Sequence, residues 1–231
     1  MPLSHLLKRK AREMKNAFDR SVVGCNRKFY DTNARAYCRT TQDADMTSLH
    51  MRFASRVPAN GTVLDAGCGS GRDSLVFKKL GLNVTAIDAS PEMVSFARKR
   101  GVRAKVSLFQ KLSIQSHFDG IWASATLLHI PHRELHDVLT RFRCALKPDG
   151  VIFVSLKEGT GERIEADGRF FSYFTVSAFR EQARRAGFNV LEETKSAPSV
   201  PGGPCWIQFM LSPSRSEAGR SRKLNRALVS A

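Results

Sequence analysis

Three glycines at alternate positions follow a short apolar segment, in the sequence TVLDAGCGSGRD (residues 62–73). Glycine is favoured where a backbone turns sharply or comes close to a ligand, because it has no Cβ atom. The unpaired backbone amides at the start of the helix that follows would point at the same ligand. The pattern is therefore typical of a loop that binds a nucleotide-like cofactor between a strand and a helix.

The residues beside these glycines disfavour a dinucleotide as the ligand. A dinucleotide loop reads G-x-G-x-x-G/A and needs a small last residue, but Arg72 occupies that position here. Asp65 ends the apolar segment, where its carboxylate would repel a pyrophosphate but would suit a cofactor that carries a sulfonium and an amino group. Asp88 lies about 20 residues after the first glycine, where a residue that binds ribose hydroxyls is expected. Together these residues predict S-adenosylmethionine as the cofactor.

Strands and helices must alternate to position this loop, and the apolar spacing predicts that they do. The predicted strands are 62–67, 83–88, 103–108, 118–124, 150–157, 188–195 and 205–211. The predicted helices are 3–20, 45–57, 71–80, 91–100, 132–146 and 175–186. This order predicts an α/β fold with a doubly wound, mostly parallel sheet and helices on both faces. In such a sheet, ligands bind beyond the carboxyl ends of the strands, where the strand order reverses.

Five segments resemble the class I S-adenosylmethionine-dependent methyltransferases. Within that class, these segments are most similar to the bacterial small-molecule branch, which includes the tellurite-resistance-like enzymes. The segments are Val63–Asp73, Ala86–Met93, Phe118–Ala125, Leu127–His129 and Leu146–Val151. The likeness covers about residues 27–211 of the chain. It implies a Rossmann-like sheet of seven strands with the last strand antiparallel, and transfer of a methyl group from the cofactor.

The two ends of the chain are more basic than its middle. The net charge of the 231 residues is +16; residues 1–40 hold ten Lys or Arg against three Asp or Glu, and residues 212–231 hold five against one. With the resemblance, this predicts a basic N-terminal extension at 1–26, a methyltransferase domain at 27–211 and a basic disordered tail at 212–231. Basic ends suit nucleic acid or an anionic membrane surface, or they keep the protein in solution, which is the simpler interpretation.

The resemblance assigns roles around the expected crevice. Asp88 would bind the ribose, and Ala89 and Met93 would flank the adenine. Gln110 can accept a hydrogen bond from the adenine amino group through its amide oxygen. Arg72 would pair with the cofactor carboxylate or remain a surface residue. The predicted cofactor-binding residues are Asp65, Ala66, Gly67, Cys68, Gly69, Gly71, Arg72, Asp88, Ala89, Met93, Phe109, Gln110, Ala123 and Ser124.

Methyl transfer from a sulfonium is an in-line displacement, so most of the acceleration can come from alignment of the reacting groups. A base is needed only if the acceptor arrives protonated. His129, just past the fourth strand, is the candidate by position, and a structural role for it is the alternative. No constellation at the strand ends suits a divalent metal.

Two further segments are expected to face the acceptor. Tyr30 and Tyr37 lie in the entry segment 28–41, where the resemblance implies a lid, and their rings could cover a sulfonium by cation–π contact or simply pack. Lys157 and Arg169 lie in a charged stretch after the fifth strand, which forms the acceptor wall in this architecture. These charges would suit a polar or anionic acceptor, or they are solvated.

Composition narrows the remaining possibilities. No segment has the roughly 20 apolar residues of a membrane span, and the N-terminus lacks the apolar centre of a secretory signal. The five cysteines are scattered, which predicts free thiols in a reducing compartment, the cytoplasm.

The leading prediction is methylation of a small-molecule acceptor at oxygen, nitrogen, sulfur or a chalcogen oxyanion. The first alternative keeps the chemistry but takes RNA (tRNA or rRNA) or a protein as the acceptor, reached through the basic ends. The second is a binding module that holds S-adenosylmethionine without catalysis.

Overall fold

Seven strands form one central sheet in a computed structural model that describes residues 3–198 and 202–214, with side chains from residue 22 onward. The order across the sheet is β3-β2-β1-β4-β5-β9-β8. Pairing is parallel from β3 to β5, and β9 is antiparallel to both of its neighbours. The predicted doubly wound sheet with an antiparallel last strand is confirmed. The strands are β1 Thr62–Ala66, β2 Asn83–Asp88, β3 Ala104–Val106, β4 Phe118–Ala123, β5 Leu146–Lys157, β8 Phe188–Ser196 and β9 Trp206–Pro213.

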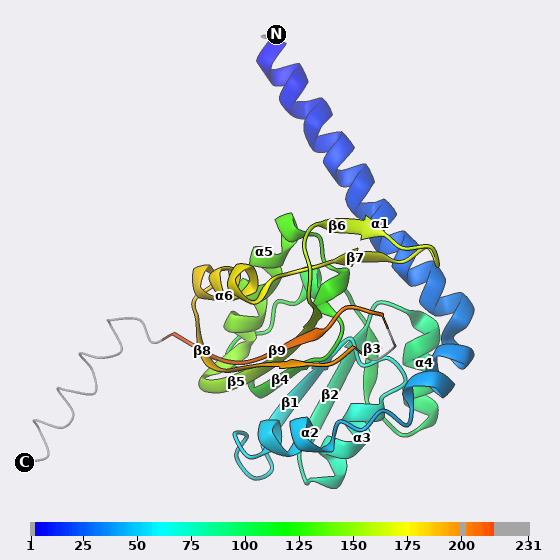
Figure 1. Cartoon of the computed structure of the whole chain (residues 1–231). Helices are drawn as coiled ribbons and strands as arrows, with labels where there is room; N and C mark the ends of the chain where they lie inside the picture. Colours follow the sequence, from blue (N-terminus) through cyan, green and yellow to red (C-terminus); the bar gives the residue numbers. More distant parts are fainter. Residues whose placement is uncertain (1–2, 199–201, 215–231) are drawn as a thin grey trace, which may run out of the picture.

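Helices cover both faces of this sheet (Figure 1). Successive strand residues point to opposite faces, so Ile121 packs in the cluster of α5 and α6, whereas Trp122 packs in the cluster of α2 and α3. The Trp122 ring stacks on that of Phe153, with centroids 4.0 Å apart. The helices are α2 Thr47–Ala54, α3 Arg72–Lys79, α4 Pro91–Lys99, α5 His132–Ala145 and α6 Val176–Arg185. None of the described helices is long and apolar enough to cross a bilayer.

The first helix, α1 (Leu3–Thr41), is much longer than the predicted helix at 3–20. It runs without a break through residue 26, where the basic extension was predicted to end. Residues 21–41 contain no proline and only one glycine, so nothing in them ends a helix. In Figure 1 the N-terminal half of α1 projects from the body, and its C-terminal half lies against α4 and β7. The predicted basic tail falls mostly at residues 215–231, outside the described residues.

A short hairpin, β6 (Glu162–Ile164) and β7 (Phe170–Ser172), replaces the loop that was expected after β5. Each strand has only three residues, which is too few for a period-two pattern to be visible in the sequence. Gly161 precedes β6 and Gly168 lies in the turn before β7, with φ values of 77° and 84°. The hairpin lies beside α1 and the turn η2 (Leu127–His129) that follows β4 (Figure 1).

Candidate functional site

A cavity of about 830 Å³ lies at the carboxyl ends of β1, β2 and β4. The strand order reverses between β1 and β4, so this is the place where an open α/β sheet binds its ligands. Helix α1 forms one wall, because Asn26, Tyr30, Tyr37 and Thr41 all line the cavity. The volume lies in the upper part of the range for small-molecule sites, about 300 to 1,000 Å³.

The structure brings most of the predicted site residues to this cavity and leaves six away from it. Those that line it are Tyr30, Tyr37, Gly67, Cys68, Gly69, Arg72, Asp88, Ala89, Met93, Phe109, Gln110, Ser124 and His129. Those that do not line it are Asp65, Ala66, Gly71, Ala123, Lys157 and Arg169. Asp73, Thr126, Ser155 and Trp206 line the cavity without having been predicted. The last two come from β5 and β9, and no local motif marks them.

The three glycines of the loop have positive φ angles but different neighbours. A Cβ at Gly67 would lie 2.0 Å from Oγ1 of Thr126, and one at Gly71 would lie 2.8 Å from Cγ2 of Val102. A Cβ at Gly69 would meet nothing within 4 Å. Gly67 and Gly71 therefore allow close packing of the protein on itself, whereas Gly69 keeps the cavity open.

The Asp88 carboxylate is held at the cavity by two backbone amides. Its Oδ2 accepts from Gly69 N and its Oδ1 from Ser90 N, each at 2.9 Å. Ser90 also caps α4, because its Oγ accepts from Met93 N at 3.1 Å. Burial raises the pKa of Asp88. A carboxylate has about four acceptor positions, so Asp88 can accept further hydrogen bonds from ligand hydroxyls.

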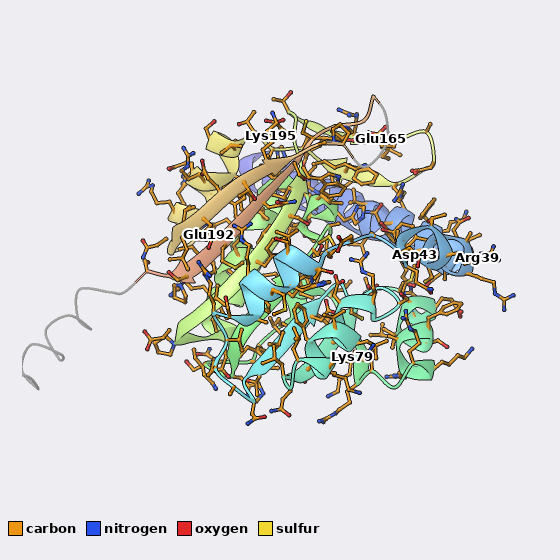
Figure 2. The ribbon with its side chains drawn as sticks, turned by 60° about the horizontal axis from the view of Figure 1, so that its bottom comes forward. Arg39, Asp43, Lys79, Glu165, Glu192 and Lys195 are labelled. Atoms are coloured by element: carbon orange, nitrogen blue, oxygen red, sulfur yellow. The ribbon has the colours of Figure 1, made fainter. Side chains whose placement is uncertain are left out.

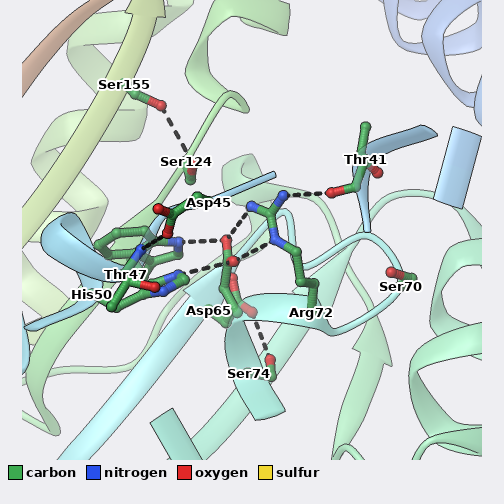
Figure 3. A network of polar contacts seen from close by, with 12 residues as sticks. Thr41, Asp45, Thr47, His50, Asp65, Ser70, Arg72, Ser74, Ser124 and Ser155 are labelled. Carbon is green, nitrogen blue, oxygen red and sulfur yellow. Dashed lines mark hydrogen bonds and ion pairs between the residues drawn. The ribbon is translucent and has the colours of Figure 1, made fainter. Parts of the chain in front are cut away.

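The second predicted carboxylate, Asp65, lies below the cavity. It is only 2% exposed and accepts from Ser74 Oγ at 2.5 Å (Figure 3). Burial, followed by repulsion from Asp73, raises its pKa. The carboxylate that lines the cavity beside α3 is that of Asp73. Asp65 was the predicted carboxylate because it ends the apolar segment, and Asp73 at the start of α3 was not predicted.

Asp73 joins three elements around the base of the cavity. Its carboxylate accepts from Trp122 Nε1 at 2.8 Å and from Arg72 Nε at 2.7 Å, and His50 Nε2 lies 3.0 Å away. Burial opposes its charge, but the hydrogen bonds from His50 and Arg72 hold the pKa of Asp73 well below its usual range. Arg72 Nη1 also donates to Thr41 O at 2.8 Å, so it ties the end of α1 to the loop (Figure 3).

His129 is fixed from both sides at the wall formed by α1. Its Nδ1 lies 2.9 Å from Phe170 O, which can only accept, so Nδ1 carries the proton. Its Nε2 lies 2.8 Å from Tyr30 Oη and therefore accepts from that hydroxyl. Burial lowers the pKa of His129 to about 4, and burial raises the pKa of Tyr30 above its usual range. Both side chains are neutral at neutral pH.

The charged residues expected to form an acceptor wall lie outside the cavity. The Lys157 Nζ atom lies 3.8 Å from the centroid of the Phe171 ring, and the Arg169 guanidinium lies 4.4 Å from that of Phe29. Arg169 also pairs with Asp167 at 2.6 Å. The hairpin β6–β7 packs on α1 and so places Arg169 against Phe29 of that helix. In Figure 2, Glu165 and Lys195 lie along one side of the molecule, with Lys79 on the other.

The remaining cavity wall mixes polar and apolar side chains, and its charges are balanced. Ser124, Thr126, Ser155 and Gln208 contribute hydroxyl and amide groups. The charged side chains that line the described cavity each have a partner: Arg27 with Asp31, Asp45 with Thr47 N, Arg52 with Glu192, Arg72 with Asp73, and Asp88 with Gly69 N and Ser90 N. Among the described residues, no group of three His, Cys, Asp or Glu side chains is arranged to hold a metal ion.

These groups fit S-adenosylmethionine. An acceptor-rich carboxylate at Asp88 suits ribose hydroxyls, and the open side of Gly69 leaves room for the ligand backbone. Gln110 lines the cavity on the side of the turn after β3.

Comparison with known proteins agrees with this fit. The family model described as a methyltransferase domain matches residues 37–193. The ubiquinone biosynthesis O-methyltransferase of Xanthomonas campestris pv. campestris (strain B100) is 37% identical over 114 residues, which are 44% of this chain and 46% of that protein. That of Xylella fastidiosa (strain 9a5c) is 32% identical over 112 residues, 45% of each chain. The chain thus matches less than half the length of these relatives.

Two solved structures share the fold. The first is the 1,6-didemethyltoxoflavin-N1-methyltransferase of Burkholderia thailandensis, with bound 1,6-didemethyltoxoflavin and S-adenosylhomocysteine. It has a TM-score of 0.70 and 25% identity, covering 82% of this chain and 87% of that one. The second, a TehB-like S-adenosylmethionine-dependent methyltransferase from Corynebacterium glutamicum, has a TM-score of 0.62 and 19% identity, covering 79% and 99%.

Proposed function

We propose that this chain, which belongs to the methyltransferase-domain family, transfers a methyl group from S-adenosylmethionine to a small, uncharged acceptor. The acceptor is held in the cavity beneath α1. The observation that carries this proposal is the cavity itself. It extends from Asp88 to the Tyr30–His129 pair, and α1 closes it on one side.

In this proposal the cofactor lies along the carboxyl ends of β1 and β2. Asp88 accepts from the ribose hydroxyls, Ala89 and Met93 flank the adenine, and Ser124 lies near the methionine portion. S-Adenosylmethionine supplies the methyl group on a sulfonium, a leaving group good enough that the protein need not form a covalent intermediate. The protein's contribution is then alignment and exclusion of water.

The Tyr30–His129 pair is proposed to take the acceptor's proton. A hydroxyl or amine that donates to Tyr30 Oη would pass its proton to that oxygen as the Tyr30 proton moves to His129 Nε2. Because Phe170 O keeps the other proton on Nδ1, Nε2 is the basic atom. Because burial lowers the pKa of His129 to about 4, Nε2 holds this proton only while the methyl group moves, and the proton returns through Tyr30 Oη to solvent in the cavity. Tyr30, rather than His129 alone, is the group that faces the acceptor in this proposal.

Three observations support an uncharged small molecule over an anion. The charged side chains lining the cavity are already paired, and Lys157 and Arg169 do not line it. The rest of the wall combines apolar side chains with hydroxyl, amide and aromatic groups, as in sites that orient a neutral ligand. Two of the proteins named above are, by their names, an O-methyltransferase of ubiquinone biosynthesis and a 1,6-didemethyltoxoflavin-N1-methyltransferase.

Transfer of a labelled methyl group from S-adenosylmethionine into a cell extract tests the proposal. We expect the label in the dialysable, uncharged fraction with the wild-type protein. Asp88→Ala should abolish the transfer, whereas Asp43→Ala, at an exposed residue that does not line the cavity, should leave it unchanged. Label in RNA or protein, or only in dialysable anions, would contradict it.

One observation keeps RNA as a second candidate. The N-terminal half of α1 projects from the body (Figure 1), and residues 3–20 hold six Lys or Arg against two Asp or Glu. A projecting basic helix could contact a phosphate backbone. In the same assay, an RNA acceptor would give label that is retained on dialysis and lost on ribonuclease treatment.

A further inference from the structure

Gln110 lines the same cavity as Asp88, the residue proposed to bind the ribose. It is part of the turn η1 (Phe109–Lys111), which follows β3. Ser107 N donates to the backbone oxygen of Asp88 at 2.9 Å, so the segment that leads into this turn is paired with the end of β2. Gln110 and Met93 line the same cavity. The Phe109 ring packs edge to face on Phe142, with centroids 5.4 Å apart, which fixes the turn on α5.

A glutamate of α5 determines which way the Gln110 amide points. Gln110 Nε2 donates to Glu134 Oε2 at 2.7 Å. A carboxylate accepts hydrogen bonds and has none to donate. The amide nitrogen must therefore face Glu134, and the amide oxygen is left for another donor.

The other carboxylate oxygen of Glu134, Oε1, is buried and lacks a hydrogen-bond partner among the described residues. A buried acceptor without a partner is unfavourable. The hydrogen bond from Gln110 to Oε2 is therefore the contact that accounts for the position of this carboxylate.

We infer that Glu134 is a positioning residue that fixes the Gln110 amide with its oxygen toward the cofactor, so that the site accepts a 6-amino purine and rejects a 6-oxo purine. A 6-amino group donates to that oxygen, whereas a 6-oxo group would place two acceptors face to face. Sites built around one hydrogen bond discriminate strongly against the analogue that leaves it unpaired. The inference rests on the proposed position of the adenine between Met93 and Gln110.

Calorimetric titration with S-adenosylhomocysteine and S-inosylhomocysteine tests the inference, because the two ligands differ only at the purine. We expect the wild-type protein to bind the 6-amino ligand at least about tenfold more tightly. In Glu134→Gln the neighbouring amide can either donate or accept, so the Gln110 amide can turn over. The affinity for S-inosylhomocysteine should then rise while that for S-adenosylhomocysteine falls, and the ratio should approach one.

Two further variants complete the test. Gln110→Leu should remove the discrimination by weakening only the 6-amino ligand. Asp137→Asn, an exposed residue on the same helix, should keep the wild-type ratio. A Glu134→Gln protein that keeps the wild-type ratio, or that loses both affinities equally, would overturn the inference. So would a wild-type protein that binds both ligands equally, although the proposed function would survive that result. A wild-type protein that binds neither would remove both.

Discussion

The glycines of the loop are required for two different reasons, packing of the protein and room for the ligand, and experiments can separate the two. All three glycines have φ between 52° and 80°, which costs a residue with a Cβ about 1 to 2 kcal/mol. Only Gly67 and Gly71 would also place that Cβ against protein atoms closer than 3.0 Å. The cavity side of Gly69 is open, so its Cβ would meet the ligand instead.

We therefore expect Gly67→Ala to affect mainly stability and Gly69→Ala to affect mainly ligand binding. Gly67→Ala should lower the free energy of unfolding by about 3 kcal/mol, because the clash with Thr126 adds to the backbone strain. Gly69→Ala should lower it by only about 1 kcal/mol but should weaken S-adenosylhomocysteine binding markedly. Urea unfolding and calorimetry on both proteins measure the two quantities. Equal stability losses with unchanged ligand affinity in Gly69→Ala would contradict this assignment.

The Tyr30–His129 pair predicts a pH dependence of stability. The pKa of His129 is about 4 in the folded protein and about 6.5 in an unfolded chain. Between these values only the unfolded chain takes up the proton at this residue. The stability present above pH 6.5 is therefore lost progressively as the pH falls toward 4, by up to about 3 kcal/mol.

Replacing His129 with Gln should remove that part of the pH profile. The difference in unfolding free energy between wild type and His129→Gln, measured from pH 7 to pH 4.5, isolates it from the carboxylates that titrate in the same range. Charged groups that face the pair are Arg169, Lys157 and Asp167, and they are the same in both proteins. A difference that is constant over this pH range would show that His129 titrates normally.

At the level of single residues, the sequence located those that follow the carboxyl ends of strands. Asp88, Gln110, Ser124 and His129 could be found because each follows a strand of a recognisable sheet. Asp73, by contrast, depends on His50 and Trp122, which come from α2 and β4. Which of two neighbouring carboxylates faces the cavity is decided by such packing, and the sequence carries no signal for it.

At the level of elements, the cavity depends on how α1 is attached to the hairpin. Asn26 is 7% exposed, and its amide pairs with both backbone groups of Phe170, at 2.7 Å to N and 3.2 Å to O. Phe170 O is also the acceptor for His129 Nδ1. One side chain of α1 therefore fixes the strand that orients the imidazole. Neither the length of α1 nor the hairpin was predicted, because both arise from contacts distant in sequence.

Asn26→Leu should separate α1 from the hairpin. It leaves the buried Phe170 N–H without its acceptor, so we expect a loss of about 2 to 3 kcal/mol in unfolding free energy. Asn33→Ala is the matched control, since Asn33 Nδ2 bonds only to Phe29 O within the same helix, and it should cost about 0.5 kcal/mol or less. Urea unfolding and limited proteolysis of α1 follow both changes. Equal losses in the two variants would show that the contact with Phe170 does not hold the helix.

For the whole molecule, the sheet and most element boundaries could be predicted. Helix α4 was expected at 91–100 and spans Pro91–Lys99, because its cap, first-turn proline and final glycine are all local signals. Strand β5 begins at Leu146 rather than at 150. The sequence did not indicate this start, because Leu146 is followed by Lys, Pro and Asp and the pairing with β4 has a register shift there. The alternation of elements predicted a mostly parallel sheet, which leaves few topologies, but the strand order itself comes from the structure.

The uneven charge of the whole molecule gives a last prediction, which separates the basic end from the catalytic body. The family match covers residues 37–193, so the projecting part of α1 lies outside it. If its charges bind polyanions without selecting an acceptor, single-stranded RNA should bind weakly and lose affinity steeply with added salt.

Changing Lys8, Arg9, Lys10 and Arg12 to Gln should then reduce the slope of log affinity against log salt by up to about 3, at roughly 0.7 per phosphate contact. S-Adenosylhomocysteine affinity and labelling of the dialysable fraction should stay at wild-type values, because the described residues that line the cavity begin at Val23. Loss of that labelling in the quadruple variant would instead show that the extension serves the methyl acceptor, and an unchanged salt slope would show that the basic residues of α1 do not contact RNA.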